Sequence, residues 1–134
     1  MEYANLGEEF ILRDCAGEGL ITPAGCFTKV CNDAELRESY LEGSAVIYGT
    51  LEETTIVGIC ELEGFGLSLY VRPGGLLLVR GRLADATIYG GTVILERGSS
   101  ATGITVGEHG RLIVQKGAKI MDISVRGGLL IKEP

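Results

Sequence analysis

Glycine recurs along this chain at a nearly constant interval, and a short run of strand-forming residues follows most of the recurrences. The intervals are 15 to 19 residues, and the series spans nearly the whole chain. A fixed period of this length indicates a repeat architecture, in which each unit buries its apolar face by stacking on its neighbours. The runs read GEEFI, GCFTK, GSAVI, GICEL, GLLLV, GTVIL, GRLIV and GLLIK, and they begin at Gly7, Gly25, Gly43, Gly58, Gly75, Gly91, Gly110 and Gly128.

A second run of strand-forming residues lies inside most units, and a further glycine often separates the two runs. These inner runs read TTIV (54–57), LSLYV (67–71), ATIYG (86–90), GITV (103–106) and DISV (122–125). Short runs rich in Val, Ile, Leu and Thr between glycines are typical of strands, whereas each glycine costs a helix about 1 kcal/mol. Residues 32–43 could instead form a helix, because Asn32 or Asp33 could cap it. Leu36 and Tyr40 also fit the pattern of the inner strand, so both structures remain possible for this segment.

The sequence therefore predicts an all-β fold, a single-stranded parallel β-solenoid (β-helix) of about seven coils of 15–19 residues with two short strands in each coil. We expect one domain, with residues 1–24 as an irregular N-terminal cap and residues 25–134 as regular coils. Seven lead glycines should mark corners that require a positive φ or a close backbone approach. They are Gly25, Gly43, Gly58, Gly75, Gly91, Gly110 and Gly128.

Alternate residues after each lead glycine should share one face of a strand. The second and fourth residues are apolar in the regular units, as in Val93 and Leu95, and we assign them to the core. The third residue should point outward, yet it is apolar in most units, with Glu61 as an exception. Such a stripe favours an oligomer interface, although a terminal segment or a long turn could cover it instead. The stripe consists of Val46, Leu78, Ile94, Ile113 and Ile131.

Charge is divided unequally between the two halves of the chain. Residues 1–65 carry thirteen acids and three bases, net −10, whereas residues 66–134 carry five acids and nine bases, net +4. The two ends could face different partners, molecules could pair head to tail, or the split could be drift among solvated positions. Glu38, Glu42, Glu52 and Glu53 form a candidate surface for a basic partner. Nucleic acid is disfavoured, because the basic half lacks a dense Lys/Arg cluster with interleaved aromatic residues.

No motif for catalysis, metal binding or cofactor binding stands out. The four cysteines, Cys15, Cys26, Cys31 and Cys60, form no close-spaced pair, and His109 is remote from them, so we expect no zinc site. The glycines match neither phosphate-binding pattern, and Ser99-Ser100 lacks the strand-to-helix elbow of a nucleophile. We therefore expect a protein that is not an enzyme and uses no cofactor.

The later units share a denser pattern of paired glycines and small residues. Gly90-Gly91, Gly98, Ala101 and Val106 mark one unit, and Gly117, Ala118, Val125 and Gly127-Gly128 mark the next. Over residues 66–131 this pattern resembles the strand-loop-strand passenger repeats of AIDA-type autotransporter adhesins. The resemblance implies a non-catalytic β-solenoid. The chain departs from that family because residues other than serine precede the paired glycines and because it has four cysteines, so we do not carry over glycosylation or surface display.

Two functional hypotheses follow. The first is a structural or interaction β-solenoid that forms a homo-oligomer and presents a protein-binding surface. The second is a small acidic inhibitor or adaptor, for example one encoded by a phage, that binds a basic surface of a host protein. No apolar run approaches the roughly 20 residues of a membrane span and no signal peptide is visible, so we expect a cytoplasmic location. A fragment of a longer passenger would instead be secreted or held at the cell surface.

Overall fold

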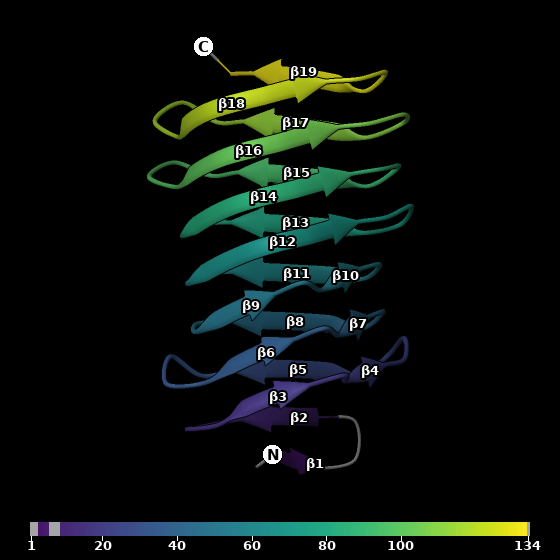
Figure 1. Cartoon of the computed structure of the whole chain (residues 1–134), viewed down its shortest axis with the longest axis vertical. Helices are drawn as coiled ribbons and strands as arrows, with labels where there is room; N and C mark the ends of the chain where they lie inside the picture. Colours follow the sequence, from purple (N-terminus) through teal and green to yellow (C-terminus); the bar gives the residue numbers. More distant parts are fainter. Residues whose placement is uncertain (1–2, 6–8, 134) are drawn as a thin grey trace.

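The computed structural model describes residues 3–5 and 9–133, and in it the chain winds as a β-solenoid from one end of the body to the other (Figure 1). Two sheets, of nine and ten strands, run along the axis. The described residues form no helix, so none of them supplies a helical membrane span. The prediction of an all-β solenoid of about seven coils is confirmed.

The first wall of the solenoid is a sheet of eight parallel four-residue strands. Their in-register partners lie 15 to 19 residues apart, so Val93 stands between Leu77 and Leu112. Side chains alternate between the outer face and the core, and the second and fourth residues of β13 and β15 are fully buried. The strands are β2 (Glu9–Leu12), β5 (Phe27–Val30), β8 (Ser44–Ile47), β11 (Ile59–Leu62), β13 (Leu76–Val79), β15 (Thr92–Leu95), β17 (Arg111–Val114) and β19 (Leu129–Lys132).

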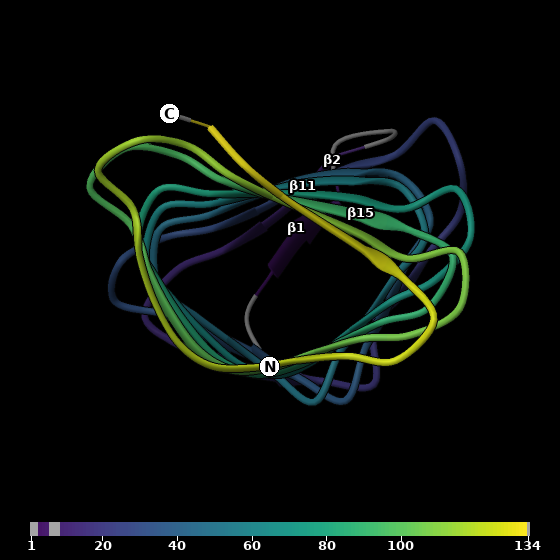
Figure 2. The ribbon, with the colours of Figure 1, turned by 90° about the horizontal axis from the view of Figure 1, so that it is seen from above.

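The other sheet bends along its length and forms two walls, so the coil has three sides instead of two (Figure 2). In the early coils the bend separates two short strands: β3 (Ala16–Glu18) from β4 (Ile21–Thr22), β6 (Glu35–Arg37) from β7 (Tyr40–Leu41), and β9 (Thr50–Glu52) from β10 (Thr55–Ile56). In the later coils one seven-residue strand spans both walls: β12 (Phe65–Val71), β14 (Arg82–Ile88), β16 (Ser100–Val106) and β18 (Lys119–Val125). We call the part before the bend the second wall and the part after it the third wall.

One column of residues makes the bend, and every member of it has a positive φ. The column, which we call the left-handed corner, consists of Gly19, Glu38, Glu53, Ser68, Asp85, Gly103 and Asp122, with φ between 48° and 71°. The register of the flanking strands stacks these seven residues on one another. Five of the seven are not glycine, although a positive φ is uncommon for such residues. Stacking therefore imposes the bend on every coil.

Buried hydroxyl groups interrupt the early strands, because they accept from the N–H groups of Leu20 and Ser39 in place of a backbone carbonyl. Just after the corner, the Ser39 hydroxyl accepts from the Leu20 N–H at 3.1 Å and donates to the Arg37 carbonyl at 2.9 Å. The Thr54 hydroxyl likewise accepts from the Ser39 N–H and donates to the Glu52 carbonyl. Side-chain hydroxyls of this kind compete with the backbone ladder. The equivalent residues of the later coils are apolar, and there the strand continues through the bend.

The lead glycines serve mainly to let the coils approach closely. A Cβ on Gly58 would overlap the backbone carbonyl groups of Gly43 and Glu42 in the coil below. Gly25 differs, because Phe27 pairs with Ser44, which puts Cys26 and not Gly25 level with Gly43. Gly25 instead has a φ of 90° and open space around its α-carbon.

Two segments differ from what the sequence analysis considered for them. Residues 32–43 form β6 and β7, with Leu36 buried in register with Leu51, so the helical alternative is wrong. Residues 9–22, which were expected to belong to an irregular cap, form a coil, because β2, β3 and β4 pair in parallel with the next coil. The strand that breaks the pattern at this end is β1 (Tyr3–Asn5), which pairs antiparallel with β2.

Replacing Ser39 by alanine tests the role of the buried hydroxyls. Ser39→Ala leaves the buried N–H of Leu20 without its acceptor, so we expect a loss of about 1–3 kcal/mol in the free energy of unfolding. Ser124→Ala, which removes an exposed hydroxyl, should change it by about 0.5 kcal/mol or less. Urea denaturation of both variants measures the difference, and equal stabilities would contradict this explanation.

Candidate functional site

The candidate interface lies on the outer face of the first wall. The third residue of each strand points outward there, and pairing places Val46, Glu61, Leu78, Ile94, Ile113 and Ile131 in one column along the axis. All five apolar members of this column are half-buried. Neighbouring members are about 4.8 Å apart, because each lies on an adjacent strand. The stripe inferred from the sequence is therefore continuous in space from β13 to β19.

A second outward column widens this apolar face. It is formed by the first residue of each strand; Ile59, Leu76 and Leu129 are apolar members of it, and Thr92 and Arg111 stand between Leu76 and Leu129. Ile59 and Leu129 are each 50% exposed, which is high for large apolar side chains. The sequence analysis missed this column, because the residue just after the lead glycine is apolar at Gly58, Gly75 and Gly128 but polar at Gly91 and Gly110. We call the two columns together the apolar face.

Arg80 compensates for Glu61, the acid that stands between Val46 and Leu78 in the first of these columns. Its guanidinium lies 3.4 Å from Glu61, 2.7 Å from Glu63 and 2.9 Å from Glu96, so it links three successive coils along one margin of the wall. The hydrogen bond that Arg80 donates to Glu63 and the charges of Glu96 and Glu63 raise the pKa of Arg80. The apolar face thus has a charged but internally paired margin, the arrangement of an apolar centre and a polar rim found in protein interfaces.

The acidic candidates do not form one surface. Glu38 and Glu53 are neighbours in the left-handed corner, and Glu52 lies beside them, 3.4 Å from Arg37. Glu42 follows β7 at the far end of the third wall and does not belong to the group. Glu18, which pairs with Arg37 in the register of the second wall, joins it instead. We call Glu18, Glu38 and Glu53 the acidic corner.

The carboxylates of the acidic corner are crowded. A hydrogen bond to Glu18 raises the pKa of Glu38 above its usual value, and the charges of Glu18 and Glu53 raise it further, against the lowering effect of Arg37. All three side chains are exposed, so their repulsion is screened by water and salt. The corner nevertheless carries negative charge that the described part of the chain does not neutralise.

The side chains that could bind a metal ion or act as a nucleophile do not gather at one site within the described residues. No three His, Cys, Asp or Glu side chains among the described residues gather as metal ligands. His109 occupies an exposed turn with a φ of 60°. Cys60 is fully buried in the core, and burial together with the charge of Glu61 raises the pKa of its thiol to about 12. Such a thiol is a poor nucleophile near neutral pH.

Comparisons with known proteins address the fold. No protein-family model matches the chain, and no curated protein sequence matches it. Among solved structures, the chain is similar to a hyper-glycosylated fragment of TibA, glycosylated by TibC. The identity is 14% and the TM-score 0.49, and the match covers 89% of this chain and 68% of the TibA fragment. The chain adopts the β-solenoid that the resemblance to autotransporter repeats implied, and an AIDA-type repeat is consistent with it.

The crowding at the acidic corner predicts a specific pH dependence. Because the folded state raises the pKa of Glu38, the folded state binds a proton more tightly than the unfolded chain, and the repulsion grows as pH rises through that pKa. Glu38→Gln should therefore be more stable than the wild type at pH 7, and the difference should shrink as pH falls toward 4.5. Melting temperatures from pH 4.5 to 8 measure it.

Glu42→Gln is the matched control, because it removes one carboxylate at a different corner of the coil. A stabilisation by Glu38→Gln that stays constant over this pH range, or one that Glu42→Gln reproduces, would contradict the crowding.

Proposed function

We propose that this protein is a non-catalytic structural module that self-associates through the apolar face of its first wall. The observation that carries this proposal is the contiguous run of Leu78, Ile94, Ile113 and Ile131 on an outward face, widened by Leu76 and Leu129. Large contiguous apolar patches on soluble proteins usually mark interaction sites. A second copy is the occupant that the chain itself offers, because the same flat face recurs on every molecule.

The shape of the apolar face supports pairing between equal surfaces. A wall of parallel strands with one side chain per coil in each column presents a regular surface, and two such walls can interdigitate as the sheets of a β-sandwich do. Homo-oligomers with two-fold symmetry use one patch on both subunits. The margin at Arg80 is already paired within the chain, so it can border the contact without leaving a buried charge uncompensated.

Introducing one charge into the apolar face tests this proposal. Ile94→Lys and Ile113→Lys each place an ammonium group within the contact, where desolvation disfavours it. We expect each variant to be a monomer under conditions in which the wild type is an oligomer, as measured by light scattering coupled to size-exclusion chromatography. Thr105→Lys makes a similar change on the outer face of the third wall and should keep the wild-type mass.

The measured masses can also contradict the proposal. A wild type that stays monomeric at high concentration, or Ile94→Lys and Ile113→Lys variants that keep the wild-type mass, would contradict the proposed interface. Circular dichroism of each variant shows whether the β fold is intact.

We propose as a second role that the acidic corner contacts a basic protein surface. The crowding of Glu18, Glu38 and Glu53 supports this role, because a cationic partner would relieve their repulsion. Glu42 takes no part, since it lies at another corner.

A further inference from the structure

The outward column of the third wall is uncharged and rich in hydroxyl groups. Parallel pairing stacks one residue from each coil in this column, about 4.8 Å from the next. Every member except the first carries a hydroxyl group, and none of them is Asp, Glu, Lys or Arg. The members are Ile21, Tyr40, Thr55, Tyr70, Thr87, Thr105 and Ser124. We call them the hydroxyl column.

A hollow of about 270 Å³ lies beside this column, between two tyrosine rings. Tyr70 pairs with Thr87, a smaller residue, and Tyr89 follows Thr87 two residues later. The register of β12 and β14 also sets Arg72 beside Tyr89. In this square of four residues the tyrosines occupy one diagonal, and Arg72 and Thr87 occupy the other.

Both tyrosine rings are accessible. Tyr70 is 46% exposed and Tyr89 is 53% exposed. The next residue in the column of Tyr89 is Gly107, which brings no side chain over the ring; a Cβ there would lie 3.1 Å from the Tyr89 Cδ2 atom. The hydroxyl groups of Tyr70, Thr87 and Tyr89 have no hydrogen-bond partner among the residues that the structure describes. The hollow therefore presents two aromatic rings and three hydroxyl groups to a ligand.

Arg72 supplies an unpaired positive charge at one edge of the hollow. Its guanidinium forms no ion pair within the described part of the chain. Glu42 lies in the same column but two coils below, about 10 Å away. Glu108 leans instead toward Gly127, and Asp85 leans over the left-handed corner. The charge nearest to the two rings is thus a cation that no acid neutralises.

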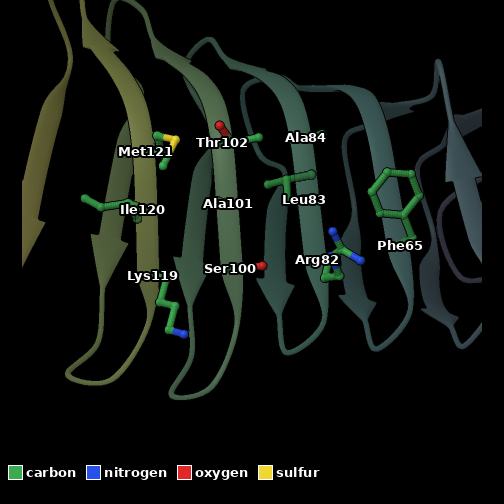
Figure 3. Close-up of a pocket in the computed structure, with 10 residues that line it drawn as sticks. All are labelled: Phe65, Arg82, Leu83, Ala84, Ser100, Ala101, Thr102, Lys119, Ile120 and Met121. Atoms are coloured by element: carbon green, nitrogen blue, oxygen red, sulfur yellow. The ribbon is translucent and has the colours of Figure 1, made fainter.

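A larger hollow on the second wall has a different character (Figure 3). It measures about 370 Å³ and lies around Ser100 and Thr102, with Arg82 and Lys119 in the row beside it. The left-handed corner offsets these two bases, because it carries an acid on the strand of each. The acids are Asp85 and Asp122. Of the described residues that line this hollow, one is aromatic. Paired rings and an uncompensated cation therefore distinguish the hollow on the third wall.

We propose that the hollow on the third wall binds one ring of an acidic oligosaccharide. A pyranose ring has a face of C–H groups that packs on aromatic side chains, and hydroxyl groups at its edge that pair with those of Tyr70, Thr87 and Tyr89. The carboxylate of a uronic acid accepts two hydrogen bonds from the Arg72 guanidinium, in the geometry that arginine offers to carboxylates. The hollow is near the lower end of small-molecule sites, which measure roughly 300–1,000 Å³, so it suits a single ring.

The hydroxyl column extends this contact along the axis. Its members are about 4.8 Å apart, which is similar to the length of one ring in a linked saccharide chain. Thr55 and Thr105 therefore offer hydroxyl groups to the rings on either side of the one in the hollow. The third wall is a different side of the coil from the apolar face, so this site does not depend on the proposed self-association.

Titration of the ¹⁵N-labelled protein with a trimer of galacturonic acid tests the site. We expect saturable changes in the amide signals of Tyr70, Thr87 and Tyr89. Tyr89→Ala should weaken the binding about tenfold, because one ring contact is lost. Arg72→Gln should weaken it by a similar factor, through the lost hydrogen bonds to the carboxylate. The methyl ester of the same trimer has no carboxylate, so it should bind wild type and Arg72→Gln equally.

Tyr48→Ala is the matched control, because Tyr48 is 47% exposed but lies at the turn after β8. It should bind the trimer as the wild type does. An absence of saturable changes at the hollow, an unchanged affinity of Tyr89→Ala, or an equal loss in Tyr48→Ala would overturn the site. A methyl ester that binds the wild type as tightly as the acid would overturn the preference for an acidic sugar.

Uridine monophosphate provides the competing chemistry, because it offers an aromatic base and an anionic phosphate to the same rings and the same guanidinium. If it shifts the same amide signals at lower concentration than the trimer does, the hollow is a nucleotide site and the proposal is wrong. None of these measurements depends on whether Ile94→Lys removes the contact of the apolar face, so the two proposals fail separately.

Discussion

Hydrogen bonds between successive coils, in one parallel register, hold the rest of this structure in place. At the end of the third wall the same bond recurs coil after coil: from the Tyr89 N–H to the Val71 carbonyl at 2.8 Å, from Gly107 to Ile88 at 2.8 Å and from Arg126 to Val106 at 2.7 Å. Each coil buries its apolar residues only because its neighbours continue these ladders. The same register forces unfavourable backbone at the left-handed corner, where even Glu38 and Glu53 adopt a positive φ.

A fixed register also turns each sequence position into a column on the surface. The inward columns are constrained by packing, and they are apolar except where Ser39, Thr54 and a few other hydroxyl residues are enclosed. The outward columns are not constrained by the core and differ between the walls: the later coils of the first wall present mostly apolar side chains, and the second wall presents mostly polar and charged ones. Surfaces of this kind suit contacts between large, regular faces better than the enclosure of a small substrate.

Much of the fold follows from the sequence because its main signal is local. The glycine period and the alternation within runs such as TVIL were enough to predict the coils, the first wall and its buried residues. The left-handed corner was not predicted, because Glu38, Glu53 and Ser68 carry no local mark of a positive φ, which stacking on the neighbouring coils imposes. The grouping of Glu42 with Glu38 was an error of the same origin: nearness in sequence does not tell which wall of a coil a residue ends on. The hollow around Ser100 and Thr102 on the second wall was also missed, since it joins residues from separate coils.

If a second copy covers the apolar face of the first wall, as we propose, methyl NMR on the wild-type protein detects that cover directly. Isoleucine methyl groups are labelled, and a soluble paramagnetic agent broadens those that it can reach. Within one chain Ile59 is 50% exposed on the apolar face, and Ile21 is 71% exposed on the third wall. We predict that in the assembled protein the signals of Ile59, Ile94 and Ile113 persist while that of Ile21 is lost. If the methyl signals of Ile59 and Ile94 are broadened as strongly as expected from the exposure of these side chains in a single chain, no second copy covers the face and the proposed contact is contradicted.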